Sequence, residues 1–153
     1  MAITPETKQI IFDRIKIEME KCCPPLVVTE NSKTGYQLIG NKPVPYGYKK
    51  EIIPGMYFAS IVVRKDNVSF YFFSIYMDLK SFEKISPALL KCLDGKTCFH
   101  FRKDEQVNVK ELSALLKKGV QSWKKLGYVK QKNLVSNGCD KVRHRFTDYL
   151  LIF

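Results

Sequence analysis

The side chains of this sequence with the most chemistry to offer are two histidines and five cysteines. Cys98 and His100 stand at positions i and i+2 of a β-prone segment, so on a strand they would share one face. A zinc or other transition-metal site requires several such ligands that converge in space. One pair is more typical of a strand histidine that is hydrogen-bonded to its neighbours, and the adjacent Cys22 and Cys23 add no metal-site spacing. We therefore expect no metal and no other cofactor.

Nucleophilic catalysis would require a cysteine or serine paired with a base and an orienting carboxylate. Neither His100 nor His144 lies in a nucleophile elbow or a glycine-rich turn. The sequence also contains no phosphate-binding loop of the GxGxxG or Walker type. We therefore expect a protein without enzymatic activity.

The formal net charge of +11 raises the hypothesis of a polyanionic partner, because clustered lysines and arginines displace counterions from nucleic acids. Residues 110–153 contain ten Lys or Arg against three Asp or Glu. A solvated helix face followed by a basic tail is the simpler interpretation of this bias. Weak nucleic-acid binding through the basic C-terminal third is therefore kept as an alternative.

The chain shows no feature of a membrane or exported protein. Apolar runs stop well short of the roughly 18 residues that a membrane-spanning helix needs. The segment MAITPETKQIIFDRIK lacks the pattern of a secretory signal, and the five cysteines include no CxxC pair. We therefore expect a cytoplasmic protein with reduced thiols and no membrane partner.

The spacing of apolar residues predicts an antiparallel sheet with a helix at each end. Phe12, Ile15 and Met19 recur at helical spacing, and Thr4-Pro5 is a helix start signal. The order predicts an α+β fold, an antiparallel sheet of about five to six strands flanked by N-terminal and C-terminal helices. The expected elements are a helix over 5–23, strands over 26–30 and 36–39, an irregular connection over 40–55, a long hairpin of strands 56–64 and 68–77, a short helix over 86–93, a strand over 97–103 and a helix over 109–126.

The second strand of the long hairpin is apolar on both faces. Phe70, Phe72 and Tyr76 would point to one face, and Tyr71, Phe73, Ile75 and Met77 would point to the other. A strand with one face in water normally alternates apolar with polar residues. The second face must therefore be covered or must be a binding surface, and one of Phe72 and Phe73 should face away from the helices.

Residues 46–50 combine Tyr46 and Tyr48 with Lys49 and Lys50, a pattern that can bind single-stranded nucleic acid by stacking and charge. Tyrosines of a connection that pack over the neighbouring apolar strand are the simpler interpretation. Both tyrosines thus belong to the expected binding region.

Three segments resemble the YdhG-like family, a domain of unknown function. They are YFASIVVRKDNVSFYFFSIYMD over 57–78, ISPALLKCLDGKTCFHFRK over 85–103, and KKGVQSWKKLGY over 117–128. The resemblance implies a compact antiparallel sheet between an N-terminal and a C-terminal helix. Some members are described as frataxin-like intracellular iron chaperones, so the resemblance also implies an iron-binding alternative.

Iron handling of this type would use a ridge of carboxylates, because hard iron ions prefer oxygen ligands. The first predicted helix offers four acids that are interleaved with four basic residues, which would pair with them. A salt-bridged surface helix is therefore favoured over an iron site. The acids are Glu6, Asp13, Glu18 and Glu20, and the bases are Lys8, Arg14, Lys16 and Lys21.

These observations predict a non-enzymatic module that binds a small apolar or amphipathic ligand or a protein, with a second copy of the chain as one such partner. Residues 1–128 would form the α+β domain. Residues 129–153 would form a basic extension whose apolar end, 149–153, docks on the same domain. The expected ligand-binding residues are Tyr46, Tyr48, Tyr57, Tyr71, Phe73 and His100.

Overall fold

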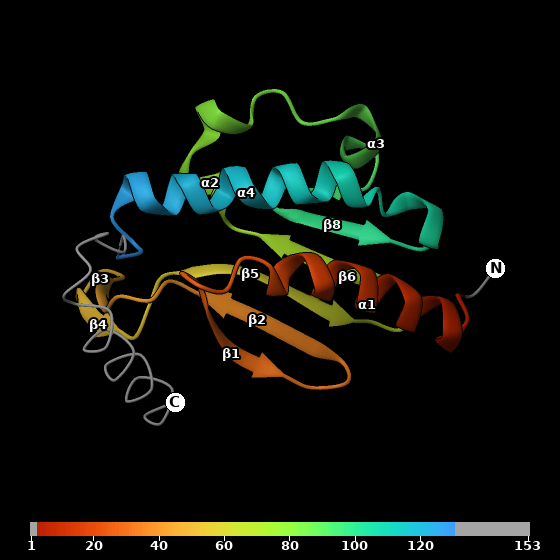
Figure 1. The fold of residues 1–153 in the computed structure, drawn as a ribbon, viewed down its shortest axis with the longest axis horizontal. Helices are drawn as coiled ribbons and strands as arrows, with labels where there is room; N and C mark the ends of the chain where they lie inside the picture. Colours follow the sequence, from red (N-terminus) through yellow and green to blue (C-terminus); the bar gives the residue numbers. More distant parts are fainter. Residues whose placement is uncertain (1–2, 131–153) are drawn as a thin grey trace, which may run out of the picture.

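The computed structural model describes residues 3–130, which form an α+β fold around one antiparallel sheet (Figure 1). The sheet has six strands in the order β1-β2-β5-β6-β8-β7. The prediction of an antiparallel sheet of about five to six strands between two terminal helices is confirmed. The strands are β1 (Val27–Asn31), β2 (Gly35–Ile39), β5 (Tyr57–Val63), β6 (Val68–Phe72), β7 (Leu93–Asp94) and β8 (Cys98–Phe101).

The two long helices are α1 (Pro5–Glu20) and α4 (Val109–Leu126), and each begins at a capping side chain. The Thr4 hydroxyl accepts the N–H of Thr7 at 3.2 Å, and the Asn108 side chain accepts the N–H of Glu111 at 3.2 Å. Helix α4 ends at Gly127, whose φ of 83° is left-handed. The predicted extension of α1 to residue 23 is wrong, because the chain turns before the two prolines at 24 and 25.

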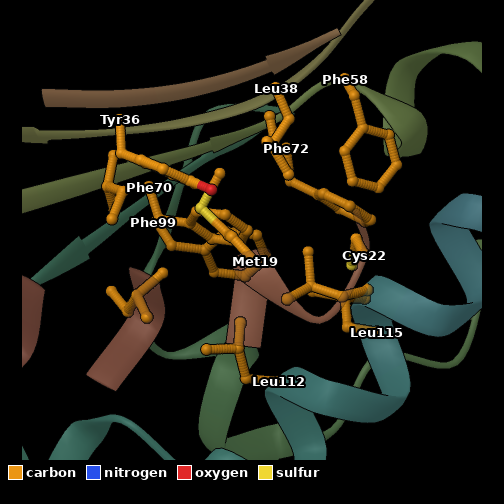
Figure 2. Packing of buried hydrophobic residues seen from close by; sticks show 14 of the residues in the cluster. Met19, Cys22, Tyr36, Leu38, Phe58, Phe70, Phe72, Phe99, Leu112 and Leu115 are labelled. Carbon is orange, nitrogen blue, oxygen red and sulfur yellow. The ribbon is translucent and has the colours of Figure 1, made fainter. Parts of the chain in front are cut away.

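Both helices pack on the same side of the sheet, and the core lies between them and that side (Figure 1). Figure 2 shows the rings of Phe70, Phe72 and Phe99 extending from the strands toward Met19 of α1 and Leu115 of α4. These side chains are almost completely excluded from solvent. Their burial supplies the main stabilisation of the fold, at about 25 cal/mol for each Å² of apolar surface.

Strand β6 is shorter than predicted and ends at Phe72. The Phe73 N–H donates to the carbonyl of Phe58, and helix α2 (Ser74–Met77) follows at once. The prediction of a strand through residue 77 is therefore wrong. After β6 the chain turns toward α4, where Ile75 and Phe82 enter the core. This segment continues through the 3₁₀ turn η1 (Leu79–Phe82) to α3 (Pro87–Leu90), a shorter helix than predicted.

The connection over 40–55 is not wholly irregular, which corrects the prediction. It contains a second, two-stranded sheet of β3 (Val44–Tyr46) and β4 (Glu51–Ile53), called the arm below. Val44 anchors the arm in the core, while its tip at 47–50 is exposed. A last short 3₁₀ turn, η2 (Asp104–Gln106), precedes α4.

The end of the described chain packs against the start of the arm. Val129 is buried, and the N–H of Lys130 donates to the Asn41 side chain at 2.7 Å. The predicted docking of the apolar end at 149–153 lies outside the described residues. Within residues 3–130, helices with the length and apolarity to span a bilayer are absent.

Candidate binding face of the sheet

The side of the sheet opposite α1 and α4 is called the open face below. Strand pairing aligns Ser60 with Tyr71 and Tyr71 with Cys98, and it aligns Ser69 with His100. Because Phe70, Phe72 and Phe99 point into the core, these five residues point the other way. The expectation of an apolar second face is therefore wrong. The error follows from the end of β6, since Phe73, Ile75 and Met77 are not strand residues.

Tyr57 lies on the open face because β5 contains a bulge next to it. The pairing shifts between Leu38 and Ile39, so that both Phe58 and Ala59 are buried while Tyr57 lies opposite Ile39. The Tyr57 hydroxyl then hydrogen-bonds the Ser60 hydroxyl on the same face. Burial raises the pKa of Tyr57 to about 12, so its phenol is neutral at physiological pH.

Tyr71 lies near the middle of the open face, between Ser60 and Cys98 on the neighbouring strands. Its hydroxyl accepts a hydrogen bond from the Arg64 guanidinium at 3.0 Å, which fixes a cation beside the ring. Burial raises the pKa of the Cys98 thiol, while hydrogen bonds with Tyr71 and Ser69 oppose the shift. Cys98 is therefore a neutral thiol at physiological pH and a poor nucleophile.

His100 lies on the open face two residues after Cys98 on β8. Its Nδ1 lies 3.5 Å from a carboxylate oxygen of Asp94 on β7. Opposite it, Ser69 donates its hydroxyl proton to the Asn67 side chain at 2.7 Å. The predicted sharing of one strand face by Cys98 and His100 agrees with this register.

Phe73 lies at the end of the open face rather than on a strand. The centroid of its ring lies 5.9 Å from that of Tyr57, which it meets edge-on, and 5.5 Å from that of Tyr76, on which it stacks. It also meets the ring of Trp123 of α4 edge-on, with the two ring centroids 6.3 Å apart. Phe72 is fully buried, so the expectation that Phe72 or Phe73 faces away from the helices is wrong for both residues.

The remaining two predicted site residues lie on the arm. Tyr46 is 53% exposed and Tyr48 is fully exposed, so Tyr48 does not pack over the sheet as expected. The structure thus brings Tyr57, Tyr71 and His100 onto one face, with Phe73 at its end, and places Tyr46 and Tyr48 on a separate two-stranded sheet.

Sequence reasoning missed the polar partners on the open face. Arg64 follows β5 directly, and Ser60 and Ser69 stand at the alternate positions that point away from the core. The period-two alternation of serine with apolar residues is the signal that could have found both serines. The Arg64–Tyr71 contact joins the two sides of the β5–β6 hairpin and depends on the register that the hairpin turn sets.

The acids of α1 do not form a ridge. Glu18 is buried with 4% of its side chain exposed, and one of its oxygens accepts a hydrogen bond from Lys21 at 3.0 Å. Asp13 accepts a hydrogen bond from Gln9 instead. In residues 3–130, groups of three or more His, Cys, Asp or Glu with the geometry to hold a metal ion are absent.

Comparison of the chain with protein-family models, with curated proteins and with solved structures finds no match.

Proposed function

We propose that this protein is a non-enzymatic binding module whose open face contacts another protein. The observation that carries the proposal is the alignment of Tyr57, Tyr71 and Arg64 on one sheet face, while α1 and α4 both pack on the opposite face. Tyrosine and arginine are enriched at the centres of protein interfaces, because they combine large contact areas with hydrogen bonds.

The extent of the sheet indicates the expected strength of this contact. A small ligand would need a concave site, and two hollows of the described surface border α4 on the helix side of the sheet. The six strands are two to seven residues long, and at a spacing of about 4.8 Å and a rise of about 3.3 Å per residue they give a footprint of roughly 450 Å². That footprint is smaller than the roughly 800 Å² per partner of a stable interface, so we expect a weak, reversible contact.

The first partner to test is a second copy of the chain. Sedimentation velocity of the purified full chain over a range of concentrations should show a mass that rises with concentration. The double variant Tyr71→Ala/Arg64→Ala should remain monomeric, because it removes the central ring and its cation. The matched control Tyr48→Ala/Lys49→Ala removes a tyrosine and a cation from the arm and should behave as the wild type.

Native mass spectrometry of the same preparation separates the alternatives. A small amphipathic molecule retained by the wild type and lost from the Tyr71 variant would replace the protein partner with a small ligand. Bound iron would favour the iron-chaperone alternative. A wild type that neither self-associates nor retains any other molecule contradicts a binding role for the open face.

A second candidate function is weak nucleic-acid binding, and the exposed side of α4 is the observation that favours it. Five of its lysines are exposed, and its one acid, Glu111, accepts a hydrogen bond from Ser86 at 2.6 Å. Such binding would weaken steeply as salt is raised, with single-stranded DNA or heparin as the probe. The lysines are Lys110, Lys117, Lys118, Lys124 and Lys125.

Membership in the YdhG-like family is also a proposal. It is supported by the resemblance over 57–78, 85–103 and 117–128, and by the order of an N-terminal helix, an antiparallel sheet and a C-terminal helix that the resemblance implies. A cytoplasmic location is proposed with it, because cysteines without a disulfide-framework spacing are typical of a reducing compartment.

A further inference from the structure

A groove on the helix side of the molecule lies between the end of α1 and the middle of α4, away from the open face. Its volume is about 290 Å³, which is close to the lower limit of small-ligand sites. One wall is the turn that follows α1, and the other is one side of α4. The lining residues are Lys21, Cys22, Pro24, Pro25, Lys117, Val120, Gln121 and Lys124.

The groove is lined by three lysines and no carboxylate. Lys117 and Lys124 are seven residues apart on α4, so they lie on the same side of the helix about 10 Å apart. Within residues 3–130, ion pairs of these two lysines with an acid are absent. Lys21 lies across from them and, among the described residues, its charge is paired with Glu18 at 3.0 Å.

The rest of the lining adds no negative charge. Cys22 is buried, and burial raises the pKa of its thiol to about 12, so it is neutral at physiological pH. Pro24 and Val120 contribute apolar surface, and Gln121 can donate a hydrogen bond from its amide. A bound anion would therefore meet cations and a neutral wall.

We propose that this groove binds a small oligophosphate anion. The ammonium groups of Lys117 and Lys124 would each bind a phosphate group, for which lysine acts as a mobile point charge. Because their backbone positions are about 10 Å apart along the helix axis, the two lysines call for a ligand with several charges along its length, rather than one phosphate ion. This site is independent of the proposed function of the open face, which lies on the other side of the sheet.

The test is isothermal titration calorimetry of the full chain with inorganic tripolyphosphate at an ionic strength of about 0.15 M, where exposed charges more than about 8 Å apart are largely screened. The double variant Lys117→Gln/Lys124→Gln should bind at least about tenfold more weakly than the wild type. Lys21 is not replaced in this test, because its loss would leave the buried Glu18 carboxylate without a partner.

A matched control comes from the adjacent side of the same helix, about 100° around its axis. Lys118 lies 5.7 Å from the Phe82 ring, and Lys125 is close enough to Asp78 to lower its pKa. Lys118→Gln/Lys125→Gln removes the same charge at the same spacing and should retain tripolyphosphate affinity within about twofold. An equal loss of tripolyphosphate affinity in both variants would show a general effect of net charge and would overturn the proposal of a binding site in the groove.

Two further outcomes would also overturn the proposal. One is the absence of measurable heat from the wild type with tripolyphosphate. The other is binding of a single-stranded DNA oligonucleotide, but not of tripolyphosphate, that depends equally on both lysine pairs. That result would assign the lysines of α4 to an extended nucleic-acid surface instead.

Discussion

Gly119 of α4 lies directly against the ring of Phe72 on β6. A Cβ atom at position 119 would be 2.5 Å from Cζ and 2.9 Å from Cε2 of that ring, and 3.0 Å from Cε2 of Phe58. Helix α4 can therefore approach the sheet this closely only because residue 119 lacks a side chain. Phe58 and Phe72 themselves meet edge to face at 5.5 Å, which leaves neither ring free to move aside.

The first prediction concerns this contact. Gly119→Ala should lower the free energy of unfolding by about 1 to 3 kcal/mol through overpacking, although alanine is the better helix former by about 1 kcal/mol. Urea unfolding measures the difference. Gln121→Ala, at an exposed position of the same helix, is the control and should change stability little. A Gly119→Ala protein as stable as the wild type would show that the helix can shift away from the sheet.

The second prediction separates the two faces of β6. Phe72→Ala should cost about 3 to 5 kcal/mol of unfolding free energy, since the ring is completely buried in the core. Tyr71→Ala should cost less than about 2 kcal/mol, because its ring lies on the open face and loses mainly the Arg64 hydrogen bond. Equal costs, measured by chemical denaturation of both variants, would mean that the open face is covered in the folded protein.

The third prediction concerns the dependence of stability on pH. One oxygen of Asp78 accepts hydrogen bonds from Ser81 at 2.7 Å and from Ser122 of α4 at 2.8 Å. These bonds hold the pKa of Asp78 below its ordinary value of 3.8. Because the folded pKa is the lower one, the stabilisation is present above the unfolded pKa and is lost as the pH falls through the folded value.

Replacement of Asp78 by asparagine should therefore lower stability at neutral pH and reduce the further loss on acidification below about pH 4. Melting temperatures recorded at a series of pH values measure both effects. Ser122→Ala should shift the acid transition toward higher pH, since it removes one of the bonds that stabilise the carboxylate. An unchanged pH profile in both variants would contradict the role of this carboxylate.

The fourth prediction concerns the thiol of Cys22. Its pKa of about 12 leaves roughly one molecule in 10⁴ as thiolate at pH 8, whereas an ordinary cysteine is partly ionised there. Alkylation of Cys22 at pH 8 should be more than about a hundredfold slower in the native protein than in urea. Peptide mass mapping follows this residue separately from the other cysteines, and similar native and unfolded rates would show that the α1 end opens readily.

The parts of the fold that follow from local signals could be predicted from the sequence. The caps at Thr4 and Asn108 and the alternation of Phe99 and Phe101 depend on residues close together in the chain. The end of β6 could not be predicted in this way. The apolar run continues past Phe72, and only the packing of Ile75 beneath α4 shows that it leaves the sheet.

The candidate site likewise combines features that follow from local sequence signals with features that do not. The side of the strand that bears Tyr71 and the side that bears His100 follow from alternation alone. The alignment that places Tyr71 beside Ser60 and Arg64 depends on the register of the β5–β6 hairpin, and its alignment with Cys98 depends on a pairing with β8, farther along the chain. The expectation that Tyr46 and Tyr48 lie in the same region is limited by the proline-rich connection, which carries no sequence signal of the two-stranded arm.

The arm has a further consequence for how this fold can vary. Its two ends meet at Gly40 and Gly55, where a side chain at either position would collide with backbone, and the Gly40 N–H donates to the Met56 carbonyl at 2.8 Å. The intervening residues thus leave and re-enter the sheet at nearly the same place. Because the two ends of the arm are held together, changes in the length of its tip should have little effect on the pairing of β2 with β5. The tip of the arm is accordingly the natural place in this architecture to graft a foreign peptide.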